Sequence, residues 1–311
     1  MRINEKRSIS KYKMRKCASG VCFFNRETGI NVLLDEVRIP EREYSPAPRN
    51  VSIALTNRCD LNCPFCFVPK DTFTLDFDQL KGWLIELDEN GTLGVGFGGG
   101  EPTLHPEFTE ICRFAAEQTA LAVSFTTHGH SLDKKNLNAL KRCVNFIRIS
   151  MDGIGTTYEQ LRNRSFHDLL KRLADIRESG IRFGINYILN AKTFPCLDEA
   201  TKIAESAGAT EFLLLPEMPV CGSVGCTGDI LKQLRDWVSG NRGTLRLSIS
   251  EFSSDGFPVC NPFLNETGLR AFAHIDAAGN LKRTSFNEFG TSIGDGVMVA
   301  LGKLMLEQET T

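Results

Sequence analysis

The 311-residue sequence has almost no excess charge of either sign, because 36 lysines and arginines stand against 38 aspartates and glutamates. A net charge of −2 gives no reason to expect nucleic acid or a membrane surface as a partner. No apolar run approaches the length that spans a bilayer, and the basic stretch 1–16 lacks the apolar core of a secretory signal. We therefore expect a cytoplasmic protein with no membrane or nucleic-acid partner.

Cysteine, by contrast, is abundant. Eleven cysteines without a secretory signal favour a reducing compartment, where thiols are available to metals rather than joined in disulfides. Cys59, Cys63 and Cys66 have the spacing CxxxCxxC directly after the apolar run 51–55. Three thiolates on one short loop can hold three corners of a cubane iron–sulfur cluster and leave the fourth iron open for another ligand. Structural zinc is the alternative, but it needs four ligands, and the next Cys or His is His105.

The central part of the chain alternates short β-rich runs with longer amphipathic stretches, which is typical of βα units around a parallel sheet. The predicted strands are 51–55, 93–97, 121–126, 146–150, 182–189 and 211–215. The predicted helices are 80–87, 107–118, 137–142, 166–179 and 197–207. These units predict an α/β fold, a partial (β/α)6 barrel open on one side, with ligands at the carboxyl ends of the strands.

Two segments flank this barrel, which we expect to occupy residues 50–240. The N-terminal extension, 1–49, contains two apolar runs around a turn at 26–29, and this pattern predicts a β-hairpin. The hairpin either adds a strand for a peptide substrate or caps the bottom of the barrel. Residues 241–311 contain a predicted strand, a strand–turn pattern and a final helix, which together predict a small α+β module.

Polar motifs follow the ends of the predicted strands, and with the cysteine spacing they resemble the radical S-adenosylmethionine (radical SAM) superfamily. Gly99-Gly100-Glu101-Pro102 follows the second strand and resembles the GGE motif of that family. Ser150-Met151-Asp152-Gly153 follows the fourth strand and resembles its S-x-D-G motif. The turn after the third strand is similar to the T-N-G turn that the family often has, except that His128 replaces the asparagine.

The resemblance implies a set of cofactor-binding residues. Cys59, Cys63 and Cys66 would hold a [4Fe-4S] cluster, and SAM would bind the open iron. Arg162, with Arg164 as the alternative, would pair with the SAM carboxylate, which a guanidinium fork fits well. The residues that this resemblance implies as cofactor contacts are Gly99, Gly100, Glu101, Thr126, Ser150, Asp152, Arg162, Asn186 and Phe65.

The resemblance also implies an activity. Members of the family cleave SAM reductively to methionine and a 5′-deoxyadenosyl radical, which abstracts hydrogen from the substrate. The catalytic parts are then the cluster and the SAM site alone, and a flavodoxin or ferredoxin-type protein is the implied electron donor. Two substrate classes stay open, namely a ribosomally made peptide and a small metabolite such as a sugar, nucleotide or cofactor precursor.

The C-terminal segment resembles the SPASM or twitch extension, which carries auxiliary iron–sulfur clusters in relatives. Thr284 stands at the position of a ligating cysteine, and a hydroxyl is a poor iron ligand beside a thiolate. We therefore expect a lid without an auxiliary cluster. A cluster rebuilt from Cys221, Cys226 and Cys260 is the alternative.

Overall fold

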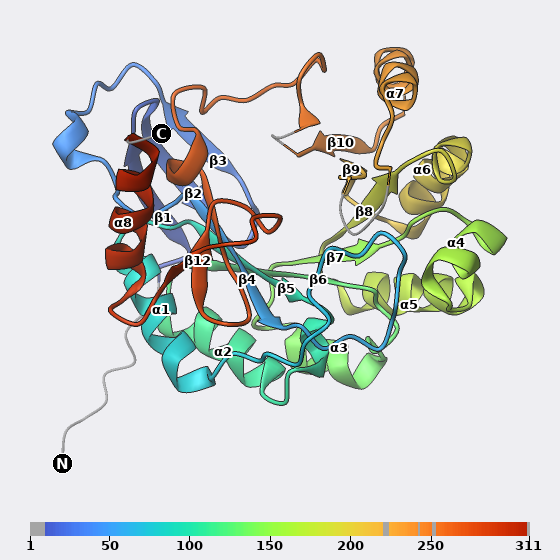
Figure 1. Ribbon diagram of the computed structural model, residues 1–311, viewed down its shortest axis with the longest axis horizontal. Helices are drawn as coiled ribbons and strands as arrows, with labels where there is room; N and C mark the ends of the chain where they lie inside the picture. The colour runs from blue at the N-terminus through green and yellow to red at the C-terminus, as the bar shows by residue number, and fades with distance from the viewer. Residues whose placement is uncertain (1–9, 220–223, 242, 251–252, 310–311) are drawn as a thin grey trace.

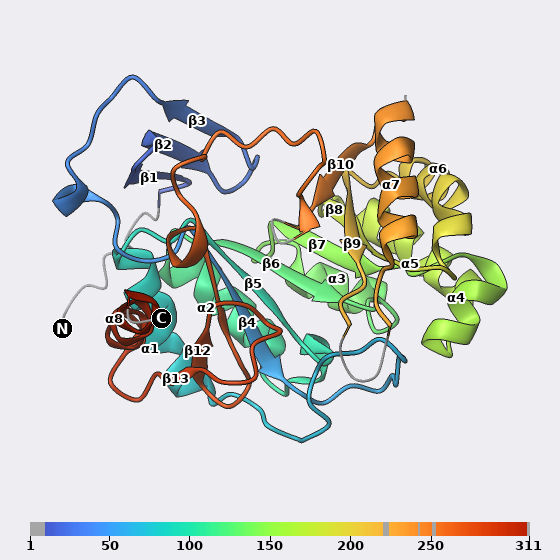
Figure 2. The ribbon, with the colours of Figure 1, turned by 45° about the horizontal axis from the view of Figure 1, so that its top comes forward.

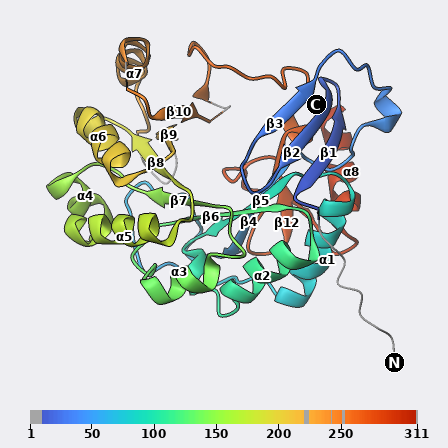
Figure 3. The ribbon, with the colours of Figure 1, turned by 180° about the vertical axis from the view of Figure 1, so that it is seen from behind.

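The structure is a computed structural model that describes residues 10–219, 224–241, 243–250 and 253–309 (Figure 1). Six parallel strands form the centre of its sheet: β4 (Asn50–Thr56), β5 (Gly94–Gly99), β6 (Ala122–Thr127), β7 (Phe146–Ser150), β8 (Phe183–Leu189) and β9 (Glu211–Pro216). The connecting helices are α1 (Phe77–Glu89), α2 (Phe108–Gln118), α3 (Lys134–Leu140), α4 (Gly155–Arg162), α5 (Phe166–Ser179) and α6 (Leu197–Ala207). They line the outer side of the curved sheet (Figures 1 and 3). The predicted α/β fold with a partial barrel is confirmed.

Local side-chain chemistry sets the helix boundaries. The Asp76 carboxylate accepts a hydrogen bond from the Gln79 N–H at 2.9 Å and caps the start of α1. Asp133 caps α3 in the same way, through the N–H of Asn136 at 2.8 Å, so this helix starts earlier than predicted. The helix α5 ends at Gly180, whose φ of 76° lies in the left-handed region that glycine adopts without strain.

Strands from the C-terminal segment extend both edges of the barrel sheet. The strand β10 (Arg246–Ile249) pairs in parallel with β9, and β11 (Phe272–Ile275) pairs in parallel with β4. The sheet continues through β12 (Asn280–Lys282) and β13 (Thr291–Ser292), and the segment also supplies α8 (Val297–Glu309). The predicted division at residue 240 therefore does not separate two sheets. An open barrel leaves unpaired backbone groups at both edges, and these strands satisfy them.

The N-terminal extension forms a three-stranded antiparallel sheet of β1 (Tyr12–Cys17), β2 (Gly20–Asn25) and β3 (Asn31–Leu34) (Figure 2). Its β2–β3 turn lies at the amino ends of the barrel strands. Arg26 donates to the carbonyl of Thr119, just before β6, at 2.7 Å, and Arg182, just before β8, donates to the carbonyl of Thr28. These contacts favour the interpretation of the hairpin as a cap over the bottom of the barrel.

A buried ion pair ties this extension to the C-terminal segment. Arg15, only 1% exposed, donates through Nε to Glu266 at 2.8 Å, and Arg49 donates to the other carboxylate oxygen of Glu266 at 2.8 Å.

Sequence patterns did not predict β1, α4 or α7 (Gly228–Gly240). Among the described residues, short 3-10 helices lie at η1 (Glu41–Glu43), η2 (Pro102–Leu104), η3 (Phe194–Cys196) and η5 (Gly268–Arg270). In the described part of the chain, each helix is too short or too polar to cross a membrane.

Candidate functional site

The loop between β4 and α1 carries the three cysteines at the carboxyl end of the parallel strands (Figure 2). Cys63 is buried in a small apolar cluster with Leu61, Phe65 and Leu161, and both Cys59 and Cys66 pack against this cluster. The Cys66 N–H donates to the Cys63 carbonyl at 3.1 Å, which closes a turn between them. All three cysteines of the loop thus belong to, or pack against, one small cluster at the carboxyl end of the strands.

The donor set fits a cubane cluster in its residue types, and the three cysteines share one small cluster of packed side chains. Within the described ranges, no three Cys, His, Asp or Glu side chains converge closely enough to hold a single metal ion. A cubane needs no such convergence, because each thiolate binds a different iron and the ligands surround a volume. Burial raises the pKa of the Cys59 and Cys63 thiols, so we expect both to be protonated in the absence of metal.

The glycine pair of the GGE turn lies directly against the backbone that leads into the cysteine loop. Gly99 has a φ of +116°, and a Cβ there would lie 2.2 Å from the carbonyl oxygen of Thr56. A Cβ on Gly100 would lie 2.3 Å from the carbonyl oxygen of Arg58. The Gly100 N–H donates to Thr56 at 2.7 Å, and the Glu101 N–H donates to Arg58 at 2.8 Å. Only glycine permits this close approach, which fixes the root of the loop.

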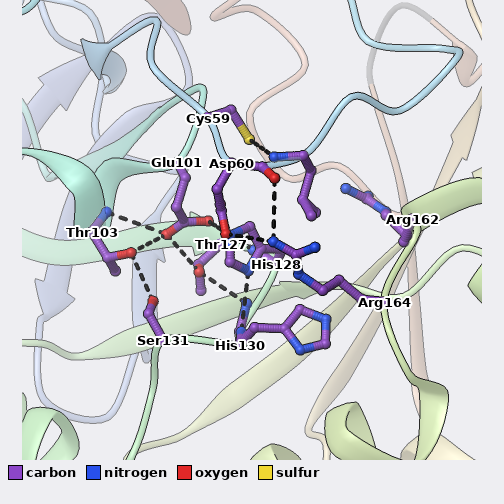
Figure 4. Close-up of polar contacts among 12 residues, drawn as sticks. Cys59, Asp60, Glu101, Thr103, Thr127, His128, His130, Ser131, Arg162 and Arg164 are labelled. Atoms are coloured by element: carbon purple, nitrogen blue, oxygen red, sulfur yellow. Dashed lines mark hydrogen bonds and ion pairs between the residues drawn. The ribbon is translucent and has the colours of Figure 1, made fainter.

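Glu101 is 1% exposed, and its carboxylate holds the neighbouring turns together (Figure 4). It accepts hydrogen bonds from the hydroxyls of Thr103 at 2.6 Å and Thr127 at 2.8 Å, and from the N–H of His128 at 3.0 Å. These donors satisfy both carboxylate oxygens. The predicted contact between this side chain and the SAM amino group stays a prediction.

Asp152 and Arg162, from two of the predicted motifs, pair with each other beside the cysteine loop. The Asp152 carboxylate accepts from Arg162 Nε at 2.8 Å through Oδ2 and from the Ile188 N–H at 2.7 Å through Oδ1. Arg162 Nη1 lies 3.4 Å from the Cys63 sulfur, and its guanidinium lies 5.3 Å from the centre of the Phe65 ring. Burial opposes the charge of Arg162, but Asp152 outweighs it and raises the pKa of the guanidinium. Arg164 instead pairs with Asp60, at 2.9 Å, on the exposed side of the loop.

The other predicted contacts lie on the strands. Ser150 and Asn186 are register partners on β7 and β8, while Thr126 pairs with Arg148 on β6 and β7. Thr126, Ser150 and Asn186 are each half-buried. Beyond them, an apolar pocket of about 90 Å³ lies between the cysteine loop and the ends of β8 and β9. Its lining includes Phe65, Phe67, Ile188, Leu215 and Phe286.

Comparison with known proteins decides the family of this region. The family model described as the radical SAM superfamily matches residues 53–192, which carry the cysteine loop, the glycine turn and the Asp152–Arg162 pair. This domain belongs to the radical SAM superfamily.

The names of two curated relatives of the radical SAM domain indicate different substrates. The Fe-coproporphyrin III synthase of Methanosarcina barkeri is 28% identical over 143 residues, which are 44% of this chain and 36% of the relative. The PqqA peptide cyclase of Ruegeria pomeroyi is 27% identical over 212 residues, which are 64% of this chain and 51% of the relative. The chain thus spans about a third to a half of the length of these relatives.

The fold of the whole chain is similar to that of a solved structure. SuiB of Streptococcus suis bound to S-adenosylmethionine superposes with a TM-score of 0.75 at 15% identity, over 96% of this chain and 90% of SuiB. SuiB bound to the precursor peptide SuiA superposes with a TM-score of 0.72 at 14% identity, over 91% of this chain and 85% of SuiB. At such identities the similarity establishes the fold.

Sequence reasoning missed a polar network beneath the cysteine loop of the radical SAM domain. His128, noted only as a departure from the expected turn, lies 2.8 Å through Nε2 from Asp60 and 3.3 Å from Glu101. The His130 N–H donates to His128 Nδ1 at 3.1 Å, so Nε2 carries the proton that Asp60 accepts. The signal in the sequence was the pair of histidines directly after β6. Asp60 follows β4, so all three residues were expected at the carboxyl ends of the strands.

The tail of the chain also reaches the site. The rings of Phe286 and Phe67 lie 4.6 Å apart, which places the segment after β12 over the cysteine loop. Thr284 donates to the Asn287 side chain at 2.9 Å. Cys226 is half-buried and Cys260 is exposed, whereas Cys221 lies outside the described residues. The SPASM or twitch nature of this segment and the expected lack of an auxiliary cluster stay predictions.

Proposed function

We propose that the chain is a radical SAM enzyme whose Cys59, Cys63 and Cys66 hold a [4Fe-4S] cluster. The observation that carries the proposal is the position of Arg162, which bridges the Asp152 carboxylate and the Cys63 thiol at the carboxyl end of the barrel. When bound and reduced, the cluster and SAM supply a 5′-deoxyadenosyl radical that abstracts hydrogen from carbon. A flavodoxin or ferredoxin-type protein is the proposed electron donor.

The residues of this chain position the cofactor and exclude water. Asp152 holds the Arg162 guanidinium in place, and the remaining N–H groups of that guanidinium are available to the SAM carboxylate. Phe65, Ile188 and Leu215 offer an apolar surface to the adenosine part of SAM. Phe286 packs against Phe67 on this side, and this contact would limit the access of solvent to bound SAM. Thr126, Ser150 and Asn186 are proposed as further polar contacts.

The substrate that we propose is a peptide, modified after translation. Support comes from the PqqA peptide cyclase, which is the curated relative with the longer match, and from the fold shared with SuiB, whose structure holds a precursor peptide. The second candidate is a small metabolite. The Fe-coproporphyrin III synthase among the relatives favours it.

Formation of 5′-deoxyadenosine tests the activity. The protein is purified without oxygen, reconstituted with iron and sulfide, and supplied with SAM and dithionite. We expect 5′-deoxyadenosine from the wild type and from Cys196→Ala, a half-buried cysteine outside the loop, but none from Cys63→Ala. Equal product from Cys63→Ala and Cys196→Ala contradicts the proposed cluster. A peptide or a metabolite that stimulates this reaction then decides between the two substrate classes.

A further inference from the structure

A second cavity, of about 660 Å³, lies at the amino ends of the parallel strands, at the opposite end of the barrel from the cysteine loop. Its lining takes in the first residues of β4, β5, β6 and β7 together with the β2–β3 turn of the N-terminal cap. The mechanism proposed above does not use this space. Among its lining residues, four arginines stand against one glutamate: Arg26, Arg148, Arg182, Arg246 and Glu211.

Small side chains on three neighbouring strands create the hollow. Ser52 on β4, Gly96 on β5 and Ser124 on β6 are register partners, so two serines and a glycine form one row across the three strands. A Cβ on Gly96 would meet only the Ser124 hydroxyl, at 3.4 Å, within 4 Å. Parallel barrels normally fill their interior with bulky branched side chains. Here the row leaves room for a ligand.

Two of the arginines share one buried carboxylate. Arg148 donates through Nη2 to Oε1 of Glu211, and Arg246 donates through Nη2 to Oε2. Burial favours the neutral form of Glu211, but the two guanidinium groups outweigh it and lower the pKa of this carboxyl. Glu211 therefore stays ionised and neutralises one of the two arginines. One positive charge remains, together with guanidinium N–H groups that Glu211 does not occupy.

The other two arginines, Arg26 and Arg182, contact backbone carbonyls. Arg26 donates to the Thr119 and Leu121 carbonyls, and Arg182 donates to the Thr28 carbonyl, so both hold the hairpin cap in place. Their charge still adds to the positive potential of the cavity. Arg148 and Arg246 are thus the pair that can take a ligand with a planar or tetrahedral oxyanion.

We propose that the interior cavity binds an oxyanion of the substrate, a carboxylate or a phosphate, between Arg148 and Arg246. This proposal rests on the proposed radical SAM function. Glu211 and Leu215 are four residues apart on β9, which is about 13 Å along a strand, and Leu215 lines the apolar pocket beside the cysteine loop. A substrate anchored by its anion at the amino ends and reacting near the loop is therefore of short-peptide or nucleotide size.

Anion binding to the reconstituted full chain, measured without reductant, tests the proposal. The probes are trifluoroacetate, followed by 19F NMR line width, for a carboxylate, and inorganic phosphate, followed by 31P line width. We expect at least one probe to bind the wild type and Arg142→Ala equally, because Arg142 is an exposed arginine that does not line the cavity. Arg148→Ala is expected to weaken that binding tenfold or more.

A second variant, Arg246→Gln, tests the site in case Arg148→Ala does not fold, because the Arg246 side chain is 69% exposed and its replacement disturbs the core little. This variant is also expected to weaken binding. Preference for trifluoroacetate supports a carboxylate-bearing substrate such as a peptide, and preference for phosphate supports a phosphorylated metabolite. Absence of binding, or equal binding by wild type, Arg148→Ala and Arg246→Gln, overturns the proposal. SAM cleavage is measured separately with dithionite, so its failure would contradict the proposed function without changing the anion result.

Discussion

The Arg162 guanidinium and the Asp152 carboxylate are 12% and 1% exposed, and each relies on the other for its main charged partner. Removal of one member of such a buried pair leaves an uncompensated charge in a medium of low dielectric constant. The exposed pair of Arg164 and Asp60 has side chains that are 36% and 43% exposed. Water already solvates those charges, so the same truncation there has a small effect.

These environments predict different losses of stability in the protein without its cluster. Arg162→Ala is expected to lower the free energy of unfolding by about 3–5 kcal/mol, and Arg164→Ala by about 1 kcal/mol or less. Chemical denaturation measures both. The double variant Arg162→Ala/Asp152→Ala is expected to lose less than the sum of the two single losses. Additive losses would mean that the pair is not coupled.

A half-buried histidine on β11, beside β4, makes stability depend on pH. Burial lowers the pKa of His274 to about 4, and its Nδ1 lies 2.7 Å from the Ser52 hydroxyl. The unfolded chain, with an ordinary histidine pKa of about 6.5, takes up this proton first as the pH falls. The contribution of His274 is therefore fully present above pH 6.5 and is lost between about pH 6.5 and pH 4.

The variant His274→Gln is expected to lose less unfolding free energy over this pH range than the wild type, by roughly 3 kcal/mol at most. Urea denaturation at several pH values between 7 and 4 measures the difference, and His130, whose pKa burial also lowers to about 4, titrates in both proteins. Parallel stability curves for the two proteins would show that His274 is not the source.

At the scale of elements, the β5–η2 turn holds the cysteine loop through backbone contacts. Gly99 and Gly98 are neighbours that differ sharply in their surroundings. A Cβ on Gly99 would collide with the Thr56 backbone, whereas a Cβ on Gly98 would meet no heavy atom within 4 Å. The pair is a matched test of how the turn positions the loop.

Gly99→Ala is expected to lower stability by about 1–3 kcal/mol through backbone strain and to lower iron incorporation, because the Thr56 backbone has to move. Gly98→Ala is expected to change both quantities little. Denaturation and iron content per chain give the answer. Iron incorporation that is the same in both variants would mean that this contact does not set the loop.

Apart from α4, the order of the barrel elements was predictable from the sequence, because each strand is a short apolar run and each predicted helix a longer amphipathic stretch. The strand β1 was not, because Lys13 and Arg15 interrupt its apolar pattern. Their charges are compensated by Asp88 and Glu266, which are distant in sequence. The pairing of β10 and β11 with opposite edges of one sheet depends on the same kind of distant contact.

The cysteine loop and the SAM motifs could be located from spacing, but their mutual contacts could not. Nothing in local spacing indicates that Arg162 reaches both Asp152 and Cys63, or that Arg148 and Arg246 share Glu211. The contact of Arg162 with Cys63 and the contacts of Arg148 and Arg246 with Glu211 join segments that are distant in sequence. The contact of Arg162 with Asp152 depends on α4, a helix that the sequence did not predict. Residue types thus indicated the candidate groups, and the fold shows which of these groups lie together.

At the scale of the whole molecule, the two ends of the barrel have different chemistry. The carboxyl ends of the strands carry three thiols, a buried ion pair and an apolar pocket, while the amino ends carry a cavity with an excess of arginine. The hairpin cap contacts the amino end, and Phe286 of the C-terminal segment packs against the cysteine loop at the carboxyl end. This arrangement suits a substrate that is anchored at one end of the barrel and modified at the other.

The most direct test of the central claim is the electron paramagnetic resonance spectrum of the reduced, reconstituted protein with and without SAM, together with the iron and sulfide content. The account predicts about four irons per chain in one [4Fe-4S] cluster and a spectrum that changes when SAM binds the open iron. About eight irons per chain would add a second cluster and implicate Cys221, Cys226 and Cys260. Zinc without sulfide, or a cluster spectrum that SAM leaves unchanged, would contradict the account.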